Sequence, residues 1–302
     1  MEPLNFYSLD AAVTALFGDD LRVVGKSPVY GGDINQAYQL SLSDGSVVFM
    51  KCNTVQNLSF FVAEAKGLAA LRGTETIGVP MPLAYGTDQT QGVSFLLMEY
   101  LGPAPKVSQY WEVFGRQLAA LHRADCSGAV SADGSMRFGF ETDNYIGASP
   151  QRNTPAADWI TFFRECRLIP QFRMADGYFD PGTRRQYARL LDRLDCYLTE
   201  PAFPSLLHGD LWSGNAICGP DGKAWIMDPA AYVGHYEAEL AMTELFGGFP
   251  SAFYQAYGEV NPIDSGYRDR RELYNLYHLL NHLNLFGRSY LSSVRRILDR
   301  YS

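Results

Sequence analysis

Polar and apolar positions alternate along much of the first hundred residues, which is the period of a half-buried β-strand. The Asp44–Gly45 pair lies between two such stretches and is typical of a hairpin turn. Two other stretches have helical spacing, and Ser8 is in position to cap the first of them. The pattern predicts strands at 37–42, 47–52, 83–86 and 93–98, and helices at 8–16 and 59–71.

Further along the chain the apolar residues recur every three or four positions, as on the buried face of a helix. Trp111, Phe114 and Leu118 form such a stripe. The segment 219–222 is predicted to be a turn between two short strands. Helices are predicted at 108–123, 156–168, 183–198, 237–245, 251–257, 270–286 and 289–300, and strands at 215–218 and 224–227.

The two patterns meet at 99–103, where a Gly-Pro pair follows the last strand predicted in the first part. We therefore predict two lobes joined by a hinge at about residue 102, with an N-lobe of 1–102 and a C-lobe of 103–302. The expected fold class is α+β, with a small antiparallel sheet in the N-lobe and a larger, mainly helical C-lobe. A chain of 302 residues is long enough for two such lobes.

The composition narrows the classes of function. A net charge of −8 argues against a nucleic-acid-binding surface as the main function. No apolar run approaches the length of a bilayer crossing and no signal peptide is evident, so we expect a cytoplasmic protein without a membrane partner. The five cysteines are scattered and include no C-x-x-C pair, which favours reduced thiols over a disulfide or zinc framework. The oligomeric state stays open, and we favour a monomer.

The octapeptide HGDLWSGN, residues 208–215, admits two interpretations. Its glycines and short polar side chains are typical of a tight turn. The same residues suit phosphoryl transfer, which requires a carboxylate near the acceptor hydroxyl and oxygen ligands for magnesium. Asp210 is the candidate base, and Asn215 and Asp228 are the candidate magnesium ligands. Their occurrence together with a phosphate anchor favours the active-site interpretation.

The phosphate anchor is predicted in the N-lobe. Lys51 lies near the end of an apolar strand and Glu64 lies on the next predicted helix, an arrangement that kinases use to hold phosphates. A lysine at such a position can also simply reach toward water. Gly31 and Gly32 permit close approach of the backbone to phosphate, although a glycine pair is also common in turns. The backbone of Glu99–Leu101 is either an adenine contact or a linker between the lobes.

Two other features carry chemistry less directly. His278 and His282 lie four residues apart on a predicted helix, a spacing that can bind zinc. No third ligand is evident, which favours a polar helix face or a satisfied histidine pair. Trp212 lies two residues from the candidate base, so it either stacks on a sugar or packs in the core.

The chain resembles the aminoglycoside phosphotransferase and choline kinase group, which has a protein-kinase-like fold, in the order of its motifs: Gly31-Gly32, Lys51, Glu64, HGDLWSGN and Asp228-Pro229. Within that group it is most similar to the fructosamine kinase family, also called ketosamine or ribulosamine 3-kinases. The octapeptide, the segment 138–153 and the stretch MDPAAYVGHYEAELAMTELFGGF at 227–249 carry this similarity.

This resemblance implies ATP-dependent phosphorylation of the sugar 3-hydroxyl of a ketosamine, which is a glycated amine or protein lysine, in a deglycation repair reaction. It implies that ATP and Mg²⁺ are bound by the residues named above, with Asp210 as the base. It also implies that Trp212, His208 and Tyr145 contact the substrate. The alternatives are a related kinase for another acceptor, such as an aminoglycoside, choline or homoserine, and a nucleotide-binding pseudokinase.

Two positions depart from the family pattern. Many members carry a cysteine directly after the glycine pair, where this chain has Asp33, so redox-linked dimers are not expected. Tyr236 stands where the pattern G-H-R-E-A has arginine. This second departure leaves open the local charge near the second magnesium ligand, or the substrate preference.

Overall fold

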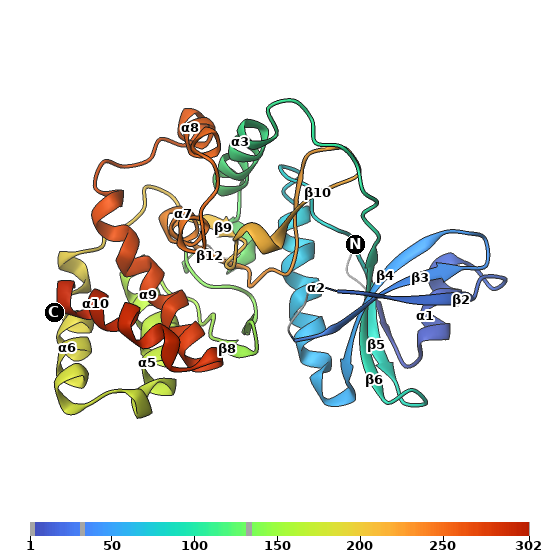
Figure 1. The fold of residues 1–302 in the computed structure, drawn as a ribbon, viewed down its shortest axis with the longest axis horizontal. Helices are drawn as coiled ribbons and strands as arrows, with labels where there is room; N and C mark the ends of the chain where they lie inside the picture. The colour runs from blue at the N-terminus through green and yellow to red at the C-terminus, as the bar shows by residue number, and fades with distance from the viewer. Residues whose placement is uncertain (1–3, 31–33, 131–134, 302) are drawn as a thin grey trace.

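The computed structural model describes residues 4–30, 34–130 and 135–301. A sheet with its two helices forms one end of the molecule, and a group of helices forms the other (Figure 1). This arrangement confirms the predicted α+β fold with two lobes. The hinge at residue 102 stays a prediction, and the last strand of the sheet ends at Glu99.

The N-lobe sheet has six strands in the order β1-β5-β6-β4-β3-β2. Its neighbouring strands are antiparallel except β1 and β5, so the predicted antiparallel sheet has one parallel edge. The prediction missed β1, which has only three residues, and β2, which is largely exposed. The strands are β1 (Leu4–Phe6), β2 (Val23–Val29), β3 (Gln36–Leu42), β4 (Val47–Thr54), β5 (Pro82–Asp88) and β6 (Val93–Glu99).

Alternation along the strands separates the two faces of this sheet. Val48 and Met50 pack in a small core with α1 (Leu9–Phe17). Lys51, one position further along β4, extends to the opposite face and reaches α2 (Leu58–Arg72). This second face joins the core of the C-lobe, so the strand period alone directs Lys51 toward the space between the lobes.

The C-lobe packs its helices closely. A Cβ at Gly115 of α3 would lie 2.2 Å from the carbonyl oxygen of Phe253 in α8, so glycine is required there. The elements are α3 (Tyr110–Arg123), β7 (Asn144–Ile146), β8 (Ser149–Gln151), α4 (Trp159–Phe162), a π-helical segment at Phe163–Leu168, α5 (Ile169–Met174), α6 (Pro181–Asp192), β9 (Ser205–Leu207), β10 (Ala216–Cys218), β11 (Ala224–Ile226), β12 (Tyr232–Gly234), α7 (Tyr236–Leu245), α8 (Ser251–Val260), α9 (Tyr267–Phe286) and α10 (Leu291–Tyr301).

The predicted helices of this lobe are present, most with ends within three residues of the prediction, and two of them differ by six residues at the C-terminal end. The helix predicted at 156–168 begins at Trp159 and continues through the π-helical segment to Met174, with Pro170 in the first turn of α5. The helix predicted at 183–198 ends at Asp192. None of the helices in the described part of the chain combines the length and the apolar character that a bilayer crossing requires.

Candidate active site

The octapeptide forms a loop between β9 and β10, and its backbone depends on glycine. Gly209 has a φ of +83°, and a Cβ there would lie 2.1 Å from the carbonyl oxygen of Ala230. The next residue, Asp210, is held by Asn215, whose Nδ2 donates to the Asp210 carbonyl at 2.8 Å and to its carboxylate at 3.3 Å. The loop therefore brings a carboxylate and an amide together within one short turn.

Asp210 differs electrostatically from an ordinary aspartate. Burial, and after it the negative charge of Asp228, raise the pKa of Asp210 to about 8, while the hydrogen bond from Asn215 acts in the opposite direction. A carboxyl group with this pKa takes up a proton readily near neutral pH. This is the property that a general base requires.

Asp228 lies on the loop that follows β11, and its backbone is strained. Its φ is +60°, in the left-handed region that side-chain-bearing residues rarely adopt. Its carboxylate forms an ion pair with Lys51, which also donates to Glu64 at 2.5 Å. Burial acts to lower the pKa of Lys51, but the charges of Asp228 and Glu64 outweigh it and raise that pKa above its usual value. Lys51 is therefore charged and held between two carboxylates.

Helix α2 brings Glu64 to this point by packing directly on the Asp228 loop. Glu64 and Gly67 lie three residues apart and so share one side of the helix. A Cβ at Gly67 would lie 3.2 Å from Pro229 and 3.3 Å from Ala231, so the absence of a side chain permits this approach. The structure thus brings the predicted Lys51–Glu64 pair together and adds Asp228, which the spacing did not link to it.

The oxygen atoms near Asp210 fit a magnesium ion. The Met227 N–H donates to the Asn215 carbonyl at 3.0 Å, which ties together the segments that carry Asn215 and Asp228. Among the described residues Oδ1 of Asn215 has no hydrogen-bond partner, and the Asp228 side chain is 42% exposed. Mg²⁺ prefers such oxygen ligands and completes its shell with phosphate or water. The described chain holds no cluster of three His, Cys, Asp or Glu that would bind a metal alone.

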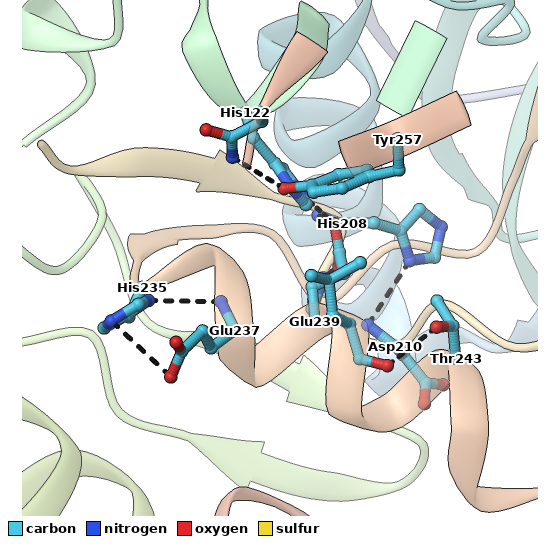
Figure 2. A network of polar contacts seen from close by, with 11 residues as sticks. His122, His208, Asp210, His235, Glu237, Glu239, Thr243 and Tyr257 are labelled. Atoms are coloured by element: carbon cyan, nitrogen blue, oxygen red, sulfur yellow. Dashed lines mark hydrogen bonds and ion pairs between the residues drawn. The ribbon is translucent and has the colours of Figure 1, made fainter. Parts of the chain in front are cut away.

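A buried carboxylate from α7 positions the octapeptide (Figure 2). Glu239 accepts hydrogen bonds from the N–H groups of His208 at 3.1 Å and Gly209 at 2.7 Å, and Oε2 lies 2.8 Å from Nε2 of His122. Burial acts to raise the pKa of Glu239, but these hydrogen bonds, that of His122 first, lower it. Glu239 is therefore ionised, and three donors from two segments converge on it.

The same hydrogen-bonded chain continues into α8. Nδ1 of His122 lies 2.8 Å from the Tyr257 hydroxyl, and that hydroxyl accepts from Asn261 at 2.8 Å. If Nε2 donates to ionised Glu239, Nδ1 of a neutral imidazole accepts from Tyr257, and every member has a partner. Neither His122 nor Glu239 was predicted from the sequence as a site residue. The available signal was the place of Glu239 inside the 227–249 stretch.

The β7–β8 hairpin fastens the other side of the Asp228 loop. Nδ2 of Asn144 donates to the Ala231 carbonyl at 2.8 Å, and Nε2 of Gln151 donates to the Ala230 carbonyl at 3.0 Å. Tyr145, between them, has its hydroxyl 3.0 Å from Oγ of Ser59 in α2. The hairpin thus contacts both the Asp228 loop and the helix that carries Glu64. The substrate contact predicted for Tyr145 stays a prediction.

His208 is fully buried and serves the loop itself. Its Nε2 donates to the Met227 carbonyl at 2.8 Å, and its Nδ1 accepts from the Asp210 N–H at 3.3 Å. Burial lowers the pKa of His208, which agrees with a neutral ring. Because both ring nitrogens are occupied, this geometry does not support the substrate contact predicted for His208.

Trp212 lies at the surface beside the candidate base. Its side chain is 38% exposed, so it is not a core residue, and its ring packs edge to face on Phe246 at 6.3 Å. A Cβ at Gly214 would lie 2.4 Å from the indole, which explains the glycine two residues later. Trp212 is therefore available to a substrate that reaches Asp210.

The predicted adenine contacts lie at the end of the sheet. The Glu99 N–H donates to the Met81 carbonyl at 2.9 Å, so it is already paired. The N–H of Leu101 makes no hydrogen bond to any described residue, which leaves it available to a ligand. Gly31, Gly32 and Asp33 lie outside the described residues.

A sheet lobe that supplies a paired lysine, and a helical lobe that supplies an Asp–Asn loop and a second aspartate, define a protein-kinase-like phosphotransferase. Comparison with known proteins identifies the family within this class. The chain belongs to the fructosamine kinase family, whose profile matches residues 6–302. It is therefore a kinase, and membership of a kinase family implies the use of ATP.

The chain is 41% identical to a probable ketoamine kinase of Synechocystis sp. over 305 residues, which cover 99% of this chain and 97% of the relative. It is also 41% identical to the chloroplastic protein-ribulosamine 3-kinase of Arabidopsis thaliana, in a match that covers 94% of this chain and 84% of the relative. The solved structure of a fructosamine-3-kinase candidate from Haemophilus somnus has a TM-score of 0.83 at 30% identity, and the match covers 97% of this chain and 96% of that one. A macrolide 2'-phosphotransferase shares the fold, with a TM-score of 0.57 at 17% identity. That match covers 96% of this chain and 95% of the macrolide enzyme.

Proposed function

We propose that this kinase transfers the γ-phosphoryl group of magnesium-bound ATP to the 3-hydroxyl of a ketosamine. The family and the names of the relatives support a ketosamine acceptor. The observation that carries the proposal is the convergence, from both lobes, of the groups that such a transfer requires: Lys51, Glu64, Asp210, Asn215 and Asp228.

In the proposed reaction the acceptor oxygen bonds to the γ-phosphorus as the bond to the β–γ bridging oxygen breaks. Asp210 takes the proton that the acceptor hydroxyl loses, which suits its raised pKa. Asn215 and Asp228 would hold the magnesium ion, which would supply positive charge to the phosphate oxygens. Lys51 leaves Asp228 for the α- and β-phosphates, and Glu64 keeps its ammonium group oriented.

The rest of the nucleotide site follows from the N-lobe. We assign the adenine to the N–H of Leu101 and to the backbone of Glu99, whose own N–H is already paired. The expectation that Gly31 and Gly32 permit close approach to the phosphates is kept for these two residues, which lie outside the described part of the chain. We place the protein in the cytoplasm, because its five cysteines are free thiols, and we keep the expectation of a monomer. A ribulosamine on a small amine is our first acceptor and a fructosamine the second, in a reaction that leads to deglycation.

The direct test is ATP consumption by the purified protein with magnesium, using a ribulosamine, a fructosamine, an aminoglycoside and choline. Asp210→Asn should lower turnover of the ketosamine by about 100-fold or more. The matched control is Asp221→Asn, because Asp221 lies in the β10–β11 turn and its side chain, among the described residues, bonds to Lys223 and Trp225 alone. This control should keep wild-type turnover.

Three outcomes contradict the proposal. Unchanged ketosamine turnover in Asp210→Asn would remove the assigned base. Turnover of choline or the aminoglycoside, with no ketosamine used, would give the site to another acceptor. ATP binding without transfer to any of the four acceptors would favour the pseudokinase alternative.

A further inference from the structure

A row of aromatic rings leads away from the candidate base along the surface of the C-lobe. Trp212 contacts Phe246 at 6.3 Å between ring centroids, and Phe246 contacts His282 of α9 at 4.6 Å. His282 lies 5.4 Å from Phe286 and 5.1 Å from Tyr290. We call these five residues the aromatic row. It joins the octapeptide to the C-terminal end of α9.

The row is open to solvent at both ends. Trp212 is 38% exposed and Phe286 is 57% exposed, while Phe246, His282 and Tyr290 are half-buried. The rings form one continuous apolar surface, and such surfaces often mark ligand-binding sites. Its continuity with the octapeptide indicates that the bound group is part of the molecule that reaches Asp210.

The far end of the row lies where the two lobes meet. A Cβ at Gly147, in the β7–β8 turn, would lie 3.0 Å from Leu285 of α9 and 3.7 Å from Ile34 of the N-lobe. Leu285 directly precedes Phe286 in the chain. The end of α9 that carries Phe286 therefore lies beside the β7–β8 turn and near Ile34 of the N-lobe.

We propose that the aromatic row binds the amine-derived part of the ketosamine, which is the group attached to the sugar through nitrogen. This assignment rests on the proposed function. With the 3-hydroxyl at Asp210 and the sugar beside Trp212, the nitrogen and its substituent extend along Phe246 and His282 toward Phe286.

The chemistry of the row fits such a group. The ketosamine nitrogen is a secondary amine, and its cationic form is attracted to aromatic faces. An aryl substituent or the apolar stem of lysine packs on the same rings. Burial lowers the pKa of His282, and Nδ1 of its ring donates to the His278 carbonyl at 2.8 Å, so the ring adds no positive charge that would repel the amine. The row therefore selects acceptors by what is attached to the sugar nitrogen.

The test compares two acceptors that share the ribulose head, one formed with methylamine and one with benzylamine. Phe286→Ala should lower kcat/KM for the benzyl compound by about 3- to 10-fold, as expected for loss of one aromatic contact, and leave the methyl compound unchanged. Phe286→Trp should restore the preference. Met174→Ala is the matched control, because Met174 is an exposed apolar residue outside the row, and it should change neither value. An equal effect of Phe286→Ala on both acceptors, or none, would overturn the proposal.

Calorimetric titration of the same two compounds separates this proposal from the kinase assignment. Tighter binding of the benzyl compound that Phe286→Ala abolishes, without any phosphorylation, would keep the aromatic row as a binding site and reject the ketosamine kinase activity. Phosphorylation of both compounds with equal affinity in wild type and Phe286→Ala would keep the activity and reject the binding role of the row.

Discussion

Replacement of Glu239 by glutamine tests whether a buried carboxylate outside the reacting groups positions the candidate base. Oε1 of Glu239 accepts from Gly209, and Oε2 accepts from His208 and lies 2.8 Å from His122. Glutamine offers one oxygen and one NH₂ group in the same shape. Reversal of the His122 tautomer lets this ring accept from the NH₂ group, but one backbone N–H of the octapeptide then has no acceptor.

The expected loss of stability follows from the number of donors that Glu239 accepts from. A buried N–H left without a partner costs about 1–3 kcal/mol, and loss of the charge weakens the remaining bonds. We expect Glu239→Gln to lose about 2–4 kcal/mol of the free energy of unfolding, which a protein with about 5–15 kcal/mol survives. Displacement of the loop by up to an ångström should lower kcat by about 10- to 100-fold. KM for ATP should change little, because the Lys51–Glu64 pair remains.

Glu237→Gln is the matched control. Glu237 lies two residues earlier on α7, is equally buried, and accepts from Nε and Nη2 of Arg270 at 2.8 and 2.7 Å. It makes no contact with the octapeptide, so its loss should lower stability by a comparable amount and leave kcat unchanged. The assays are urea unfolding and steady-state kinetics at saturating ATP. Equal kcat values for Glu239→Gln and wild type, or an equal fall in both variants, would refute the positioning role.

The pKa of Glu239 adds a pH signature to this comparison. Its folded pKa is lowered, so its contribution to stability is present above the unfolded value near 4.5 and is lost as the pH falls through the folded value. Glu239→Gln should therefore be least stable, relative to wild type, at neutral pH, and the difference should shrink below about pH 4. A difference that stays constant from pH 7 to pH 3 would show that the charge of Glu239 contributes nothing.

Two further predictions concern the reacting groups. Asp210→Asn should raise the Tm of the nucleotide-free protein, because the folded pKa of Asp210 near 8 lies above its unfolded value. The gain in the free energy of unfolding should grow from pH 4 to pH 8 by at most about 1.4 kcal/mol per pH unit. An equal Tm shift in scanning calorimetry at pH 5 and pH 8 would contradict this. Glu64→Gln should raise KM for ATP by about 10-fold with a smaller effect on kcat, because Lys51 then pairs with Asp228 alone. Initial rates measured against ATP concentration test this prediction. An unchanged KM would argue against the Lys51–Glu64 pair as a phosphate anchor.

The local elements were predictable because their signals lie within a few residues of each other. Ser8 caps α1 as predicted, accepting from the Ala11 N–H at 3.1 Å, and the Asp44–Gly45 turn joins β3 to β4. The catalytic-type loop was predictable because the octapeptide holds Asp210 and Asn215 five residues apart. In each case the chain itself fixes which groups meet.

The rest depended on contacts between distant segments. His122 and Glu239 are 117 positions apart, and nothing near either residue indicates that the two meet. In the sequence, Glu237 and Glu239 look like ordinary surface charges on a helix. Residues two positions apart on a helix face different directions, so Glu237 bonds to Arg270 while Glu239 bonds to the octapeptide. Strands of three residues, such as β9 and β12, are too short to show a period.

The two halves of the candidate site are positioned by separate glutamates. Glu239 fixes the octapeptide from within the C-lobe, and Glu64 fixes Lys51 from within the N-lobe. The Lys51–Asp228 ion pair crosses between these halves. In the proposed reaction this pair must open, since the phosphates take Lys51 and magnesium takes Asp228.

Other contacts between the lobes do not involve the reacting groups. Lys66 of α2 pairs with Glu141 at 3.0 Å, and Ser59 contacts Tyr145 at 3.0 Å. These contacts can persist when nucleotide replaces Asp228 as the partner of Lys51. In the proposed reaction, α2 would therefore stay docked on the β7–β8 hairpin while the substrate changes the charge pairing between the lobes.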